Sequence, residues 1–210
     1  MSPSDHPPAL QVHADDRWGR ACLAYNVQIP VTGDAAQAFA DAQARLDTLL
    51  TGVRPIPADA LHISVYTVIP VSWESAAKEQ HWQTLSGRVL TLLQHSCEQA
   101  RAFQLPFDKL RVDPLAVIAL AAHSHPFIDK LRHTLAELLA PTNIPHPTYT
   151  IVHSTLARFS QPALLSPTVL APIEKVALRA NVHVTTTRLV RERIYPSLTA
   201  DTLAEHQLQP

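Results

Sequence analysis

Two stretches of this 210-residue chain share one pattern and decide its fold: LHISVYTVI at 61–69 and YTIVHSTLARF at 149–159. Both are rich in β-branched and aromatic residues, which predicts a strand in each place. Successive side chains of a strand point to opposite faces, so a residue shares its face with the residue two positions away. Each stretch places a histidine two positions before a hydroxyl residue, and each strand therefore carries a polar pair on one face.

The polar pairs are His62 with Ser64 and His153 with Thr155. Unpaired polar groups on a buried strand cost free energy, so these side chains need a partner. If the two strands face each other, two imidazoles and two hydroxyls meet in one groove. A neutral imidazole accepts a proton, a protonated one donates a proton, and the hydroxyls bind phosphate oxygens. We therefore predict these four residues as the catalytic residues of a phosphodiesterase that needs no metal and no cofactor. Two strand histidines satisfied by neighbouring groups are the alternative interpretation.

The rest of the chain predicts an α+β fold, because runs of strands mix with helices instead of alternating strictly. A strand–helix–strand unit in the first third returns in the second half, and each copy carries one histidine motif. Residues 1–18 are polar and proline-rich, which predicts a loose arm before a single two-lobed domain over 19–210. The expected further strands are 21–29, 103–107, 115–121, 181–193 and 203–208, and the expected helices are 34–50, 72–101, 126–139 and 167–178.

Composition excludes several classes of protein. Lys+Arg is 17 and Asp+Glu is 18, which argues against a protein that coats long nucleic acid. The four glycines form neither a dinucleotide-binding nor a P-loop motif, and two cysteines make no disulfide framework. The longest apolar run, 115–122, is too short for a membrane helix, and the N-terminus does not resemble a signal peptide. We expect a cytoplasmic monomer with no membrane or stable protein partner.

Three residues near the motifs are predicted to bind substrate. Tyr66 shares a face with the first motif and could stack on a base, or be an ordinary strand tyrosine. Arg158 could offer its guanidinium to a phosphate, although alternation places it opposite the second histidine, where it would be a surface arginine. Tyr25, on the first long strand, could border the groove or pack in the core.

A separate pair, His123 and His125, suggests a different hypothesis. Two histidines at this spacing could hold a metal ion, which would make the protein a metallohydrolase. The pair directly precedes Pro126, which is typical of the first turn of a helix. Histidines at a loop or helix entry are therefore the alternative.

LHISV and VHSTLARF resemble the paired signatures of the two-histidine (2H) phosphoesterase superfamily, which includes 2′-5′ RNA ligase-like proteins and cyclic phosphodiesterases of tRNA splicing. The resemblance covers roughly 20–208. It implies two pseudo-symmetric α+β lobes around a central groove. It also implies opening of 2′,3′-cyclic phosphates or cleavage of 2′-5′ linkages, with a nucleotide or RNA end as the partner, and some relatives act on ADP-ribose 1″,2″-cyclic phosphate.

By this resemblance His62 and His153 would be the acid–base pair, and Ser64 and Thr155 the donors to phosphate oxygens. The chain departs from the family pattern at Ser64, where threonine is common, and at 65–67, where many members have an apolar run that ends in glycine. These departures affect the pocket edge, so a nucleotide- or RNA-end-binding module without catalysis is the alternative function.

Overall fold

The strands form one curled, nine-stranded antiparallel sheet and a separate two-stranded ribbon. The computed structural model describes residues 9–210. The sheet order is β11-β10-β2-β4-β7-β6-β5-β9, and β3 adds to β7. The strands are β1 (Leu10–Val12), β2 (Ala21–Pro30), β3 (Val53–Pro55), β4 (His62–Ile69), β5 (Phe103–Asp113), β6 (Ala116–Ala121), β7 (His153–Phe159), β8 (Ala163–Leu165), β9 (Ala180–Val184), β10 (Thr186–Ile194) and β11 (Thr199–Gln207).

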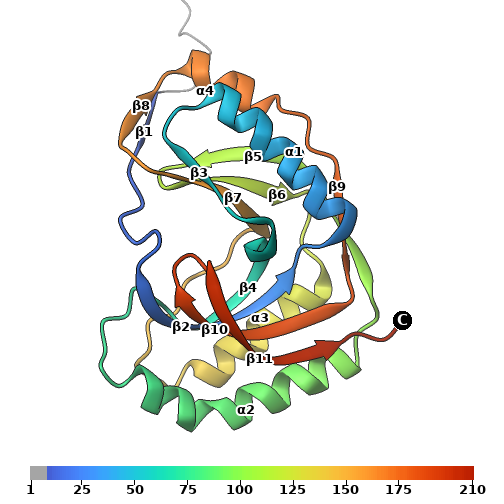
Figure 1. The fold of residues 1–210 in the computed structure, drawn as a ribbon. Coiled ribbons are helices and arrows are strands. Elements are labelled where there is room, and N and C mark those ends of the chain that lie inside the picture. Colours follow the sequence, from blue (N-terminus) through green and yellow to red (C-terminus); the bar gives the residue numbers. More distant parts are fainter. Residues whose placement is uncertain (1–8) are drawn as a thin grey trace, which may run out of the picture.

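The sheet is two half-sheets joined at one point. Strands β4 and β7 pair at a single position, Ile63 opposite Ser154. One half is β11-β10-β2-β4 and the other is β7-β6-β5-β9. Each half lies on its own side of the molecule, with helices outside it (Figure 1). This arrangement confirms the expected α+β fold of two pseudo-symmetric lobes.

The helices that join the motif strands cross between the halves. Helix α1 (Gly33–Leu49) follows β2 in one half but packs on β7 and β9 in the other. Helix α3 (Pro126–Leu139) follows β6 but packs on β4. Helix α2 (Lys78–Glu98) covers β2, β10 and β11, α4 (Pro167–Glu174) covers β5, and a 3₁₀ turn, η1 (Ala58–Ala60), precedes β4. Each motif strand is thus covered by a helix from the opposite half of the topology.

The core lies between the outer face of each half-sheet and its helices. Phe39 of α1 is fully buried and meets Phe107 of β5 edge to face, with ring centroids 5.3 Å apart. Burying each such side chain contributes about 1.5–3 kcal/mol. Apolar residues at helical spacing, including Leu131 and Leu135 of α3, make the same kind of contact. The apolar periodicity that predicted these helices is therefore the face that packs on the sheet.

Two expected elements have different limits. The strand expected at 181–193 is divided at residue 185, because β9 pairs with β5 in one half and β10 pairs with β2 in the other. The helix expected from 72 begins at Lys78. Within 9–210, no helix is both long and apolar enough to cross a membrane.

The prediction of a loose arm over 1–18 is wrong for residues 9–18, whereas 1–8 lie outside the described residues. Strand β1 pairs with β8, and Val12 is fully buried. The backbone N–H of His13 donates to the carbonyl of Pro114 (2.8 Å), and that of Asp15 donates to Phe159 (2.9 Å). Two apolar residues at alternating positions are enough to add this short strand, although the surrounding composition is polar.

Candidate active site

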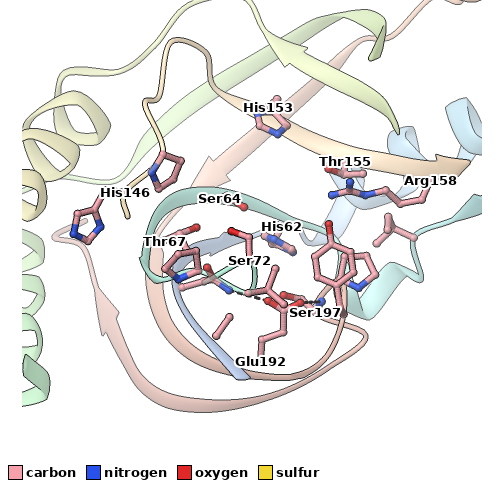
Figure 2. A pocket seen from close by; sticks show the side chains of 18 of the residues that line it. His62, Ser64, Thr67, Ser72, His146, His153, Thr155, Arg158, Glu192 and Ser197 are labelled. Carbon is pink, nitrogen blue, oxygen red and sulfur yellow. Dashed lines mark hydrogen bonds between the residues drawn. The ribbon is translucent and has the colours of Figure 1, made fainter. Parts of the chain in front are cut away.

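The two halves enclose a cavity of about 460 Å³. His62 and Ser64 line it from β4, and His153 and Thr155 line it from β7. Figure 2 shows the two motif strands facing each other across this space. The structure therefore brings together all four residues that the sequence predicted as catalytic.

The single β4–β7 pair sets how the motifs face each other. Ile63 and Ser154 are fully buried, and their neighbours on each strand point to the other side, into the cavity. In an antiparallel pair, the residue after one position lies across from the residue before its partner. Next to this pair, Ser64 therefore lies on the side of His153, and His62 on the side of Thr155. Each imidazole shares its end of the cavity with a hydroxyl from the other strand.

Both motif strands carry a β-bulge at the equivalent place. The pairing of β4 with β2 skips Val65, and the pairing of β7 with β6 skips Leu156. An extra residue on one strand reverses the faces of the residues that follow it. The cavity side of β4 therefore continues at Thr67, and that of β7 continues at Arg158.

The bulges change two predictions made from simple alternation. Arg158 lies in the cavity and is not on the opposite face from His153 (Figure 2). Tyr66 does not share the face of the first motif: it is 2% exposed, packs against Tyr149 at a centroid distance of 5.3 Å and does not line the cavity. Its predicted substrate-binding position is wrong, and Thr67 occupies that place.

Each bulge is held by a side chain from the crossing helix. Arg132 of α3 donates from Nε to the carbonyl of Val65 (3.0 Å) and from Nη2 to that of Ser64 (3.3 Å). Gln43 of α1 donates from Nε2 to the carbonyl of Leu156 (2.8 Å) and to that of Ile56 (2.8 Å). A bulge leaves backbone groups outside the regular ladder, and buried carbonyls need donors. These two side chains supply donors, and the carbonyl of Leu156 also accepts from the N–H of Ile56 (2.8 Å).

Tyr25 lies away from the cavity, so its prediction as a substrate-binding residue is wrong. It is fully buried on the helix-covered face of β2, stacks on Trp82 of α2 (4.4 Å between centroids) and donates to a carboxylate oxygen of Glu79 (2.7 Å). Its strand neighbours Ala24 and Asn26 line the cavity instead.

The two histidines differ in their hydrogen bonding. The Nδ1 atom of His62 lies 2.8 Å from the carbonyl oxygen of Ala60. A carbonyl can only accept, so Nδ1 carries the proton and Nε2 of the neutral ring is free to accept one. The Nδ1 atom of His153 is buried and has no hydrogen-bond partner among the described residues.

Burial lowers the pKa of both rings. It lowers the pKa of His62, against the effect of the hydrogen bond to Ala60. It also lowers the pKa of His153 to about 4, where the charge of Asp113 opposes the shift and that of Arg158 adds to it. An anion placed between the rings would act in the opposite direction, because negative charge stabilises imidazolium.

Arg158 is the cation of the cavity. Its Nη1 lies 3.3 Å from Oδ2 of the buried Asp15, and its guanidinium lies 5.5 Å from the ring centroid of Tyr195. Its Nε is buried without a hydrogen-bond partner among the described residues. The guanidinium is thus held in place while retaining donors for an anionic ligand.

A buried acid forms the opposite wall. Glu192 is 4% exposed, and its two carboxylate oxygens accept from Asn26 Nδ2 (2.9 Å) and from the backbone N–H of Ser197 (2.6 Å). Burial raises the pKa of Glu192, and these two hydrogen bonds oppose the shift. Sequence reasoning missed these residues and His146, which also lines the cavity, since none belongs to a motif. The one available signal was a lone asparagine inside the apolar strand ACLAYNVQI.

The pair His123 and His125 lies outside this cavity. His125 is the N-cap of α3: its Nδ1 accepts from the N–H of Phe127, and its ring stacks on Phe103 at 3.6 Å. Across residues 9–210, no group of three or more His, Cys, Asp or Glu side chains is placed to hold a metal ion.

Solved structures share this architecture over nearly their whole length. TT0787 of Thermus thermophilus superposes with a TM-score of 0.61 at 18% identity, covering 89% of this chain and 98% of that one. LigT of E. coli in apo form gives 0.59 at 18% identity, covering 90% and 98%. The chain has the LigT fold. The PDE domain of MHV ns2 is more distant, with a TM-score of 0.50, 12% identity and coverage of 80% and 98%.

The likeness to LigT confirms the fold that the two-histidine phosphoesterase resemblance implied. Crystal structures of LigT include complexes with phosphate, 3′-AMP and ATP. No family model matches the sequence, and no curated protein is similar to it at a significant level.

Proposed function

We propose that the protein is a metal-independent phosphodiesterase that hydrolyses 2′,3′-cyclic phosphates or 2′-5′ linkages of nucleotides or RNA ends. The observation that carries this proposal is the convergence of both histidine–hydroxyl motifs and Arg158 on one cavity. The LigT fold supports it, and so do the phosphate and 3′-AMP complexes of LigT itself.

The proposed reaction is an in-line attack of water on phosphorus. His62, protonated at Nδ1, takes the proton of the water at Nε2. His153 becomes protonated when the anionic substrate binds, and it gives this proton to the leaving ribose oxygen. Water thus adds to phosphorus, the bond to the leaving oxygen breaks, and a phosphomonoester and a free hydroxyl remain.

The remaining cavity residues would stabilise the charge that develops on phosphorus. Ser64 and Thr155 donate hydrogen bonds to the non-bridging oxygens, and Arg158 adds a charged donor. Donors fixed before the reaction stabilise the transition state without reorganising. The bulge in each strand supports this arrangement, because it places a third side chain of the strand beside the motif pair.

The test is hydrolysis of a panel of 2′,3′-cyclic mononucleotides, 2′-5′ dinucleotides and ADP-ribose 1″,2″-cyclic phosphate, with chelator present. His62→Ala and His153→Ala should each lower kcat by about 10²–10⁴-fold, the usual contribution of acid–base catalysis. His133→Ala is the matched control, since this exposed histidine pairs with Glu137 and does not line the cavity. Full turnover by either cavity variant would refute the proposal, and activity abolished by chelator would refute its metal-free form.

A binding module without catalysis is the second candidate. Burial favours neutral forms of both imidazoles, and a neutral pair lacks the acid that the leaving oxygen needs. Tight binding of a 2′- or 3′-nucleotide, with no hydrolysis of any panel member between pH 5 and 8, would establish this function instead.

A further inference from the structure

A smaller cavity of about 280 Å³ lies beside the first. Three cationic side chains line it, and Val71 and Tyr195 line both cavities. The cations are Arg17, Arg20 and Lys78. Within the described part of the chain, no acidic residue lines this second cavity.

The turn that carries the two arginines is fixed to Tyr195. The N–H of Gly19 donates to the carbonyl of Tyr195 (2.8 Å), and the N–H of Tyr195 donates to the carbonyl of Arg20 (3.1 Å). Gly19 has a φ of 72°, a left-handed conformation that glycine adopts without strain. Tyr195, which lines both cavities, therefore fixes the position of the turn that carries the two arginines.

Asp15 ties the same turn to the first cavity. Its Oδ1 accepts from the N–H of Arg17 (3.2 Å), and its Oδ2 lies 3.3 Å from Nη1 of Arg158. Asp15 is 7% exposed, and its own N–H donates to the carbonyl of Phe159 at the end of β7. One buried carboxylate thus holds both the basic turn and the cation of the first cavity.

The three cations lack acidic partners. Among residues 9–210, Arg17, Arg20 and Lys78 form no ion pair. The arginines of strand β10, by contrast, are all paired: Arg188 with Glu205, Arg191 with Glu79 and Arg193 with Asp201. The charges of Glu192 and Glu74 act on Lys78, but neither residue lines this cavity. Three cations around a hollow without an acid in its lining attract an anion.

Lys78 is the most enclosed of the three. It is 8% exposed, and its amino group donates to the carbonyls of Leu23 (3.0 Å) and Val71 (3.1 Å). An ammonium group has three donors, so one remains for a ligand.

We propose that this second cavity binds a second phosphate group of the substrate. The inference rests on the proposed function and narrows its substrate class. The preferred substrate is a di- or oligonucleotide with a terminal 2′,3′-cyclic phosphate, whose next phosphate lies among Arg17, Arg20 and Lys78. A nucleoside cyclic monophosphate fills only the first cavity.

The test compares uridine 2′,3′-cyclic phosphate with a diuridylate that ends in the same cyclic phosphate. The wild-type protein should prefer the two-phosphate substrate by about tenfold or more in kcat/KM, the effect of one or more charge-assisted hydrogen bonds. In the double variant Arg17→Ala/Arg20→Ala, the ratio of kcat/KM for the two-phosphate substrate to that for the monophosphate should fall close to one. The control Arg45→Ala/Arg179→Ala removes two exposed arginines elsewhere and should keep the ratio. A wild type without preference, or a double variant that keeps it, would overturn the inference.

Binding separates this inference from the proposed catalysis. Adenosine 3′,5′-bisphosphate should bind the wild type more tightly than 3′-AMP in calorimetry, and the double variant should lose the difference. If no cyclic substrate is hydrolysed but this difference is present, the catalytic proposal fails and the subsite stands. If hydrolysis occurs but the bisphosphate has no advantage, the subsite fails and the catalytic proposal stands.

Discussion

Ile63 and Ser154 form the single registered pair between β4 and β7, and both side chains are fully buried. The pair joins the two half-sheets, and it makes the two motif strands direct neighbours at this position. Residues on either side of it point into the cavity from both strands. The relative position of the two histidine motifs therefore depends on this contact.

Ser154 should tolerate loss of its hydroxyl but not added volume. Its Oγ is buried without a hydrogen-bond partner in residues 9–210, and such a group costs about 1–3 kcal/mol. Ser154→Ala should therefore keep or raise the free energy of unfolding and leave kcat unchanged. Ser154→Leu should lower that free energy by about 1–3 kcal/mol through overpacking. Urea unfolding with an activity assay checks both, and a large loss of stability in the alanine variant would contradict the account.

Arg132 and Gln43 should affect catalysis without touching the cavity. Arg132→Met removes the side-chain donors to the carbonyls of Val65 and Ser64. Gln43→Leu removes the side-chain donor to the carbonyls of Ile56 and Leu156, of which Leu156 still accepts from the N–H of Ile56. Each unsatisfied carbonyl should cost about 1–3 kcal/mol of stability. The bulge of β4 positions Thr67 and that of β7 positions Arg158, so each variant should also have a lower kcat. The assay is run at low temperature, where both variants remain folded.

The control for the α3 variant is Lys130→Met, an exposed position on the same helix. Arg132→Lys should restore part of the stability, since it keeps one charged donor. Loss of stability with an unchanged kcat and KM would assign both side chains a role in folding alone.

Because of the bulge in β4, substitutions at the adjacent residues Tyr66 and Thr67 should have different effects on activity. Tyr66→Phe should leave kcat/KM unchanged, because this ring packs outside the cavity. Thr67→Val should raise KM, because its side chain lines the cavity and the hydroxyl is lost. Steady-state kinetics on one cyclic substrate decides the matter, and the reverse pattern would mean that β4 lacks the bulge in solution.

Burial of the histidines predicts the pH dependence. It lowers the pKa of His62 and lowers that of His153 to about 4. The required acid loses its proton above its pKa, so kcat/KM, which reports the free protein, should fall as pH rises through the range below 6.5. Bound phosphate stabilises imidazolium, so the alkaline limb of kcat should lie at higher pH. A kcat/KM that increases up to pH 8 would contradict the lowered pKa values.

The sequence predicted the elements with strong periodicity and the four motif residues, because alternation on a strand is a local property. It could not predict the side of the strand occupied by Tyr66 or Arg158, since a bulge depends on how a neighbouring strand pairs. Tyr25 was misplaced for a similar reason: the face that α2 covers is decided by tertiary packing. The ordered packing of residues 9–20 could not be predicted, because it depends on backbone hydrogen bonds and on Asp15, with only two apolar residues in β1.

Both imidazoles should bind one phosphate, and a crystal structure of the protein with 3′-AMP would show whether they do. We expect one phosphate group with oxygens within about 3.2 Å of a ring nitrogen of His62 and of His153, a hydrogen-bond distance. A phosphate that contacts only one of these rings, or that binds at another surface while the cavity is open, would contradict it.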